Sequence, residues 1–358
     1  MAHGAFISDF LNVLHRATMK EVVSLFRAVT TLLVAYALIA MKSSTQPNPE
    51  PRALFEPRGG NRTLIHRRCF PATAQPAARC PITIVTAYFD VPSKRGREFY
   101  VRWMQNILSI KSCMVVFTDD CHLFRQHASS HRVILHTDLQ KEIGVFNQPT
   151  QFWERQVEMD PEREIHRGYR LYWVWSLKPI FVSKGAEYGF FGSDYYAWMD
   201  IGMLRNDKFN SANIRGVTPP ASFDPSCIHL GMPNPFEPSD LIVHANGSCM
   251  TPFTERDRVC GCAFLVTKRV AHVFREIYLT TFDEYVDRGW FVGKDQNLIN
   301  TACVENTHMF RFIRPDPTLG DGWFTLAYYI LGLMPDTTPV QLHTTSYLQH
   351  IWMMAFTF

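Results

Sequence analysis

Strand-like and helix-like segments alternate through the middle of the chain, and this alternation constrains the fold more than any other feature. The β-branched run 82–88 predicts a buried strand. Apolar residues at near-helical spacing follow it, and further strands are predicted over 113–117 and 132–135. Strands that alternate with helices in this way run parallel, so we predict an α/β domain with a mostly parallel central sheet.

The same alternation continues toward the C-terminus. Helices are predicted over 153–159 and 170–184, and Pro179 is expected to kink or divide the second one. Strands are also predicted over 195–199, 261–267 and 309–314. A helix is predicted over 270–286, and the segment 294–301 is predicted to form the start of another. Residues 206–258 are rich in Pro, Asn and Ser and are expected to be mostly loop, which in a compact domain usually serves a function.

An apolar run near the N-terminus is long enough to cross a membrane. Residues 22–41 span about the 20 residues that a bilayer requires. The basic residues Arg16 and Lys20 precede the run, which favours a cytosolic tail over 1–21 and an uncleaved signal anchor over 22–41. A cleaved signal peptide is the alternative, because Ala35-Tyr36-Ala37 resembles a cleavage site. A buried core helix is a further alternative.

The segment that follows the run is typical of a flexible stem. Residues 42–81 hold seven prolines and show almost no apolar periodicity. Two glycosylation sequons, at Asn61 and Asn246, lie beyond the apolar run. The nine cysteines suit an oxidising compartment, and their odd number leaves at least one without an intrachain partner. We therefore predict a lumenal domain over 82–358 of a single-pass type II protein of the Golgi or endoplasmic reticulum membrane.

Composition and missing motifs exclude several function classes. The net charge is only +3 and no Lys/Arg stripe is visible, so a nucleic-acid partner is not expected. The chain has no Gly-x-Ser-x-Gly elbow, Walker loop, His-Glu-x-x-His motif or Gly-x-Gly-x-x-Gly fingerprint. A glycosidase needs only two facing carboxylates, and the sequence leaves that possibility open.

Three predicted strands end in polar residues that can bind a ligand. The strand 82–88 ends in Thr86-Ala87-Tyr88. The strand 113–117 is followed closely by Asp119, and the strand 195–199 is followed by Asp200. In α/β sheets ligands bind at these carboxyl ends. A carboxylate there can hold Mn²⁺ or Mg²⁺ against a diphosphate, and Asp200 is the best candidate. The alternative is that Asp200 only forms a turn.

A second group of candidates lies in the segment Gly293–Asn297. Asp295 either caps the following helix or, with Gln296 beside it, accepts hydrogen bonds from substrate hydroxyls. Lys178 and Arg205 flank the Asp200 strand in the sequence, and each can pair with a phosphate or remain a solvated surface charge.

Five segments, in order, carry a resemblance to a known family. They are TIVTAYFD (83–90), MVVFTDD (114–120), LYWVWSLKPIFV (171–182), AWMDIGMLR (197–205) and FVGKDQNLIN (291–300). Together they resemble the HtrL/YibB family over roughly residues 82–315. That resemblance implies a nucleotide-diphospho-sugar transferase of the GT-A fold. The run from Asp295 to Asn300 is also similar to the Asp-Gln motif of glycosyltransferase family 8.

The resemblance implies a role for each candidate residue. Asp295 and Gln296 would face the donor sugar as catalytic residues, and Asp200 would be a metal ligand. Because position 202 is Gly, a second ligand is needed, and family 8 enzymes use a late His, for which His343 is the candidate. The nucleoside and diphosphate would contact the remaining donor-binding residues, which are Thr86, Ala87, Tyr88, Asp119, Lys178 and Arg205.

The resulting functional hypothesis is transfer of a sugar from a nucleotide-sugar donor to a glycan, glycoprotein or glycolipid acceptor, with Mn²⁺ or Mg²⁺ as cofactor. The alternative is a catalytically silent lumenal protein that uses the same fold to bind a carbohydrate or a partner. A hydrolase is a third hypothesis.

Overall fold

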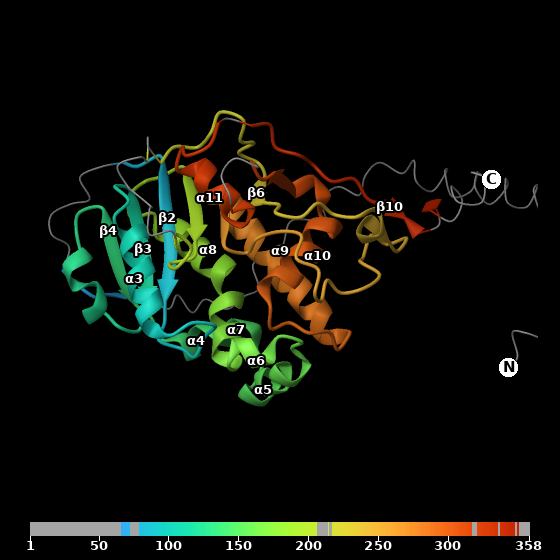
Figure 1. Ribbon diagram of the computed structural model, residues 1–358, viewed down its shortest axis with the longest axis horizontal. Helices are drawn as coiled ribbons and strands as arrows, with labels where there is room; N and C mark the ends of the chain where they lie inside the picture. Colours follow the sequence, from blue (N-terminus) through green and yellow to red (C-terminus); the bar gives the residue numbers. More distant parts are fainter. Residues whose placement is uncertain are drawn as a thin grey trace, which may run out of the picture. The chain divides into compact units, whose positions relative to one another are not determined.

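An eight-stranded sheet with the order β1-β4-β3-β2-β5-β8-β6-β9 forms the centre of the protein in this computed structural model (Figure 1). Its strands are β1 (Arg67–Arg68), β2 (Ile82–Tyr88), β3 (Cys113–Thr118), β4 (Arg132–His136), β5 (Tyr195–Met199), β6 (Ile228–Gly231), β8 (Ala263–Thr267) and β9 (Phe310–Ile313). A second sheet pairs β7 (Ile242–Val243) with β10 (Thr345–Ser346) in parallel.

The structure describes residues 66–71, 79–205, 214, 217–316, 321–335, 337–347 and 349–350. All of them belong to one compact unit, which begins at Leu64. The predicted cytosolic tail, the predicted signal anchor and Asn61 lie outside the described residues. Among the residues that are described, no helix has the length and apolarity to cross a membrane.

Helices connect the strands of the large sheet, with short 3₁₀ turns between them. The α-helices are α3 (Arg97–Leu108), α4 (Leu139–Ile143), α5 (Thr150–Met159), α6 (Arg163–His166), α7 (Tyr169–Ser176), α8 (Lys178–Tyr188), α9 (Lys268–Asp287) and α10 (Asp295–Glu305); α11 (Thr325–Ile330) follows β9. The 3₁₀ turns are η1 (His122–His127), η2 (Gly144–Phe146), η4 (Pro238–Leu241), η5 (Thr307–Met309) and η7 (Gly322–Phe324). Pro179 divides the predicted helix 170–184, because proline fits the first turn of α8 but not the middle of a helix.

Each face of the sheet is covered by its own set of helices. Along β2, Val85 and Ala87 pack into one core with residues of α7, α8, α9 and α10. Ile84 and Tyr88 point the other way, into a second core with α3 and α11. Side chains of successive strand residues alternate between the two faces, so a strand buried on both sides is apolar throughout, as the run 82–88 is.

The sheet is mostly parallel, and the predicted mixed α/β class is confirmed. β2 pairs in parallel with both β3 and β5, and β6 with β9. β8 is reversed and pairs antiparallel with β5 and β6, which the simple alternation of strand and helix does not predict. This reversal matters for the site, because it places the residues that precede β8 beside the residues that follow β5.

Part of the predicted stem belongs to the folded unit. β1 pairs antiparallel with β4, and two disulfides, Cys69–Cys121 and Cys80–Cys113, join this segment to the domain. Covalent links and edge-strand pairing, rather than apolar periodicity, hold these residues, so the expectation of a flexible stem as far as residue 81 is wrong for 66–71 and 79–81. The predicted loop 206–258 also contains the short strand β6, which lies between β8 and the edge strand β9 of the large sheet.

Candidate functional site

The carboxyl ends of β2 and β5 open into a cleft of about 300 Å³. The two strands are parallel neighbours, so Ala87 and Tyr88 lie at the same sheet edge as Asp200, and all three line the cleft. The other predicted residues among its lining are Lys178, Arg205, Asp295 and Gln296. The structure thus brings together seven residues that are spread over more than 200 positions of the sequence.

A buried lysine lies between the two carboxylates of the cleft. The Lys178 ammonium nitrogen is 3.1 Å from a carboxylate oxygen of Asp200 and 2.9 Å from one of Asp295. It also donates to the Gly261 carbonyl oxygen at 3.0 Å. Burial opposes charge on Lys178, but the adjacent carboxylates outweigh that effect and raise the pKa of its ammonium, so it stays protonated.

Asp200 is the member of this trio that faces the cleft. A third of its side chain is accessible, whereas the side chains of Lys178 and Asp295 are 4% accessible each. Its second partner is the Trp198 indole, which donates to it at 2.7 Å. Burial raises the pKa of Asp200, and the ammonium of Lys178 offsets part of that shift.

Gly261 allows the trio to form. The reversed strand β8 brings it next to the end of β5, where the Asp200 backbone N–H donates to the Cys262 carbonyl at 2.8 Å. A Cβ atom at position 261 would overlap the carboxylate of Asp295. Cys260 and Cys262 are joined by a disulfide around this glycine, rather than acting as metal ligands.

Helix α10 supports the segment that contains Gly261. The Gln296 side chain donates to the Val259 carbonyl at 3.1 Å, and the Asn300 side chain accepts from the Val259 N–H at 3.1 Å. Gln296 therefore holds the backbone of the cleft wall, although it also lines the cleft, and its predicted contact with the sugar stays a prediction.

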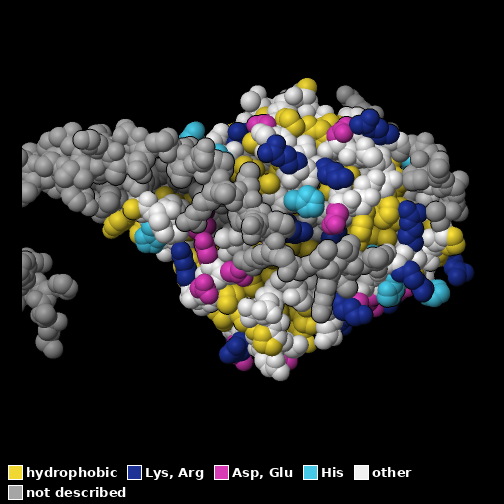
Figure 2. Space-filling view, turned by 180° about the vertical axis from the view of Figure 1, so that it is seen from behind, with side chains coloured by type: hydrophobic (Ala, Val, Ile, Leu, Met, Phe, Trp, Pro, Cys, Tyr) yellow, Lys and Arg dark blue, Asp and Glu magenta, His cyan; other side chains and the backbone are white. Residues whose placement is uncertain are grey.

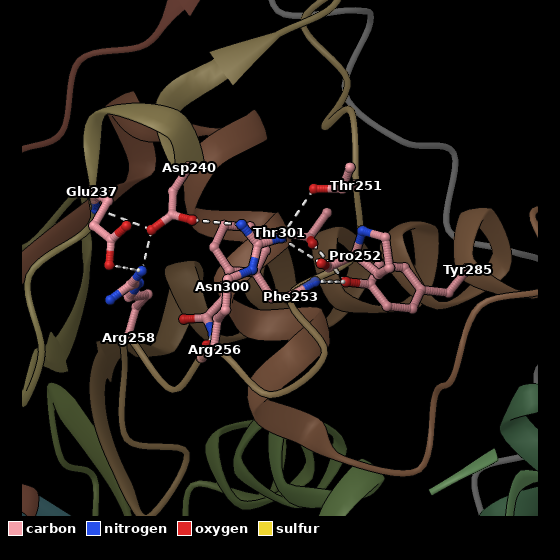
Figure 3. Close-up of polar contacts among 10 residues, drawn as sticks. All are labelled: Glu237, Asp240, Thr251, Pro252, Phe253, Arg256, Arg258, Tyr285, Asn300 and Thr301. Carbon is pink, nitrogen blue, oxygen red and sulfur yellow. Dashed lines mark hydrogen bonds and ion pairs between the residues drawn. The ribbon is translucent and has the colours of Figure 1, made fainter. Parts of the chain in front are cut away.

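A network of ion pairs extends this support away from the cleft (Figure 3). Asp240 accepts from Arg256 at 2.6 Å and from Arg258 at 2.7 Å, and the Asn300 amide donates to the Arg256 carbonyl at 2.9 Å. The Tyr285 hydroxyl, on α9, accepts from the Phe253 N–H at 3.4 Å. The loop that precedes Gly261 is thus held against α9 and α10 by many polar contacts.

Basic side chains outnumber carboxylates around the cleft. The carboxylates are Asp90, Asp200 and Asp295, and the basic residues are Lys94, Arg97, Lys178, Arg205 and Lys294. Most of the basic groups are paired: Arg97 with Asp90 at 2.6 Å, and Lys294 with Asp257 at 2.9 Å. Arg205 differs, because within the described part of the chain it has no carboxylate partner.

Arg205 is held by two aromatic rings and one carbonyl. Its guanidinium lies 5.0 Å from the ring centre of Trp103 and 5.5 Å from that of Phe324. Its Nε donates to the Gly202 carbonyl at 3.2 Å, and among the described residues its terminal nitrogens have no hydrogen-bond partner, so they can bind a ligand. A stacked guanidinium is well suited to bind phosphate, because its planar donors are oriented in advance.

Three predicted site residues lie outside the cleft lining. Thr86 is fully buried, since it points into the sheet packing rather than toward a ligand. Asp119 lines a separate cavity with Tyr169, Arg170 and Trp173, and partial burial raises the pKa of its carboxyl. His343 is exposed and is not among the residues that line the cleft.

The residues present do not form the metal site that the resemblance implies. Among the described residues, no three His, Cys, Asp or Glu side chains are grouped so that they could hold an ion. Asp200 and Asp295 do converge, but on the ammonium of Lys178. A divalent cation between these carboxylates would displace that ammonium or lie beside it.

The sequence patterns miss several residues of the cleft. Lys94 and Arg97 follow the first motif, and Trp175 lies within the motif 171–182 without being singled out; only their proximity in space links them to Asp200. Gly261 carries a detectable signal, because a glycine between two cysteines at the start of a predicted strand indicates a close backbone approach.

Comparison with known proteins gives distant likenesses among solved structures and none at the level of sequence. No protein-family model matches the sequence, and no curated protein matches it. Among solved structures, the crystal structure of mouse Xyloside xylosyltransferase 1 in its apo form aligns with 72% of this chain and 95% of that chain. The sequence identity is 8% and the TM-score 0.33. A likeness of this size carries no argument, so the functional proposal rests on the cleft.

Proposed function

We propose that the protein is a glycosyltransferase that binds a nucleotide-sugar donor in the cleft at the carboxyl ends of β2 and β5. The observation that carries the proposal is the guanidinium of Arg205, which is stacked on two rings at the rim of a largely basic cleft without a carboxylate partner among the described residues. A diphosphate supplies the negative charge that this arrangement lacks. The motif resemblance to the HtrL/YibB family, and through it to the GT-A fold, supports the same proposal.

Each residue of the cleft has a role that follows from its position. Arg205 contacts the diphosphate and stabilises the charge that develops on the leaving group, which is usually the largest catalytic contribution. The exposed part of Asp200 faces the sugar. The indole of Trp175, which lines the same cleft, offers the apolar surface on which a sugar ring packs. The acceptor, a glycan, glycoprotein or glycolipid, enters beside the loop that precedes Gly261.

The donor is tested by incubating the full-length protein with a panel of nucleotide sugars and measuring release of nucleoside diphosphate. We expect release with at least one donor. We also expect the Arg205→Ala substitution to weaken the binding of nucleoside diphosphate about 10-fold or more. Arg102→Ala is the matched control, because Arg102 also lies over an aromatic ring, that of Phe99, but does not line the cleft. Equal loss of binding in both variants, or no loss in either, would reject the role of Arg205.

A catalytically silent binding protein is the second candidate function. It is favoured by the internal use of the predicted catalytic groups: Asp295 pairs with Lys178, and Gln296 donates to Val259. This candidate predicts that a nucleotide or a sugar binds, with the same dependence on Arg205, while no nucleoside diphosphate is released with any donor and acceptor.

We also propose the lumenal, type II orientation that the N-terminal sequence indicates. Asn246 is exposed at a turn, where Ser248 donates to its side-chain oxygen at 2.8 Å, so this sequon is accessible for glycosylation. Treating intact membranes with protease should leave the domain undigested, and a peptide N-glycosidase should reduce its apparent mass. Digestion of the domain in sealed vesicles would contradict the orientation.

A further inference from the structure

We infer that the Lys178 ammonium takes the place of a divalent cation in this cleft, so that ligands bind to the protein without a metal ion at Asp200 and Asp295. The inference deepens the proposed function and rests on it, because it assigns how donor charge is met. Its central test, however, measures metal binding alone and does not depend on a donor.

The geometry around Lys178 is that of a closed cation site. All partners come from different elements: Asp200 follows β5, Asp295 begins α10, and Gly261 precedes β8. Three groups each place an oxygen atom within 3.1 Å of the Lys178 nitrogen. Their number equals the number of protons that an ammonium can donate. Lys178 itself begins α8, whose packing on the sheet fixes the direction from which the side chain arrives.

Charge and space both disfavour a metal ion at this position. The ammonium already neutralises part of the charge of the two carboxylates that hard cations require. Its own charge would repel a divalent ion bound within a few ångströms in a partly buried site. The carboxylate of Asp295 also lies close against Gly261, so that no space for even a Cβ atom is left between them.

Lys178 differs from the basic residues of the surface because it is buried and fixed. On the face that Figure 2 shows, basic side chains of the described residues are interspersed with acidic and histidine side chains. Lys178 is instead 3% exposed and fixed at the bottom of the cleft. A cation held in this way needs no reorganisation when a negatively charged ligand arrives. Arg205 then contacts the diphosphate directly, while Lys178 keeps Asp200 and Asp295 from repelling it.

The test measures Mn²⁺ binding by electron paramagnetic resonance on the full-length protein. Four forms are compared: wild type, Asp200→Asn, Lys178→Ala, and the double variant Lys178→Ala/Asp200→Asn. Lys184→Ala is the matched control, because Lys184 also forms an ion pair from α8, with Glu142, but lies outside the cleft. The quantity of interest is the Mn²⁺ binding that depends on Asp200.

We expect no Asp200-dependent Mn²⁺ binding in wild type or Lys184→Ala. Lys178→Ala leaves the two carboxylates facing a space of ammonium size, so it should bind Mn²⁺ at least ~10-fold more tightly than wild type, and the double variant should lose that gain. Wild-type binding that Asp200→Asn abolishes would overturn the inference, as would a folded Lys178→Ala that gains no Mn²⁺ affinity.

A second measurement keeps the inference testable if Lys178→Ala does not fold. Uridine and guanosine diphosphate are titrated into wild type by calorimetry, once with EDTA and once with Mn²⁺. The same affinity in both buffers supports the inference, and binding only with Mn²⁺ overturns it. If neither nucleotide binds, the donor proposal fails, but the comparison of wild type with Asp200→Asn still decides whether the carboxylates bind a metal.

Discussion

Gly261 shows how a single residue without a side chain determines the chemistry of the cleft. Its carbonyl accepts from Lys178, and its Cα lies so close to Asp295 that any side chain would meet the carboxylate. The disulfide between its neighbours restricts the backbone on both sides. The close approach of α10 to the start of β8 therefore depends on a missing Cβ.

Gly261→Ala should lower the free energy of unfolding by about 1–3 kcal/mol, because the new methyl group forces Asp295 away from Lys178. Urea unfolding monitored by tryptophan fluorescence measures the change. Gly144→Ala is the control: no atom lies within 4 Å of the position that its Cβ would take and its φ is −57°, so the substitution should be neutral or slightly stabilising. Equal destabilisation of both variants would contradict the role of Gly261.

At the same scale, sequence patterns predict single residues but not their partners. The apolar strand that ends at Asp200 predicts a carboxylate at the sheet edge, and the structure places it there. That Lys178 would reach it from a helix 22 positions earlier follows only from the packing of α8 on the sheet. The prediction of a metal at Asp200 could not include this ammonium. A sequence shows which residues can be metal ligands, but it does not show which of them pair with a lysine in the folded protein.

At the scale of elements, local signals predict the long, regular segments well. β2, β5 and α9 lie within one or two residues of their predicted limits, because periodicity and β-branched content depend on neighbouring residues alone. The short strand β6 and the reversed direction of β8 could not be predicted in this way. β6 has four residues, and its place between β8 and β9 depends on partners far away in the sequence.

Helix α10 is the element that couples the cleft to the preceding loop. Asn300→Ala removes two hydrogen bonds, one to the Val259 N–H and one to the Arg256 carbonyl, while the ion pairs of Asp240 stay intact (Figure 3). We expect amide hydrogen exchange across 256–262 to accelerate about 5- to 30-fold, which corresponds to the loss of about 1–2 kcal/mol of local stability. Exchange should be unchanged in β2.

Asn306→Ala is the matched control for that experiment. Asn306 follows the last residue of α10, and its side-chain amide donates to the Ala302 carbonyl within the helix rather than to the loop. The substitution should leave exchange over 256–262 unchanged. If Asn300→Ala left these amides as protected as in wild type, the support of the loop by α10 would be rejected.

At the scale of the whole molecule, covalent and buried polar features act together with the two apolar cores. One disulfide joins the segment after β1 to Cys121, a second joins the segment before β2 to β3, and a third encloses Gly261. Three further cysteines, Cys227, Cys249 and Cys303, are buried and free, which agrees with the expectation of unpaired cysteines. The odd cysteine count predicts that some thiols stay free, but the pairing itself requires distances that only the fold supplies.

The stability of the folded unit should also depend on pH through one buried histidine. His229, in β6, is 1% exposed and stacks on Phe223 with 4.2 Å between ring centres. Its Nε2–H donates to the Asp224 carbonyl at 2.9 Å, so a second proton would have to occupy Nδ1, which has no hydrogen-bond partner among the described residues. Burial accordingly lowers the pKa of His229 to about 4.

The sign of the effect follows from the two states. The unfolded chain takes up this proton near pH 6.5, whereas the folded protein resists it until about pH 4, so stability is complete above pH 6.5 and falls as the pH decreases through this window. The loss attributable to His229 should reach about 3 kcal/mol at pH 4.

Urea unfolding of wild type and His229→Asn between pH 7 and pH 4 isolates this contribution, since the carboxylates titrate in both proteins. Asn carries no titrating proton, so the variant, although less stable at pH 7, should lose less stability on acidification, and the two curves should converge toward pH 4. Parallel curves would show that His229 takes up its proton equally in both states, and the buried, singly protonated imidazole would then be ruled out.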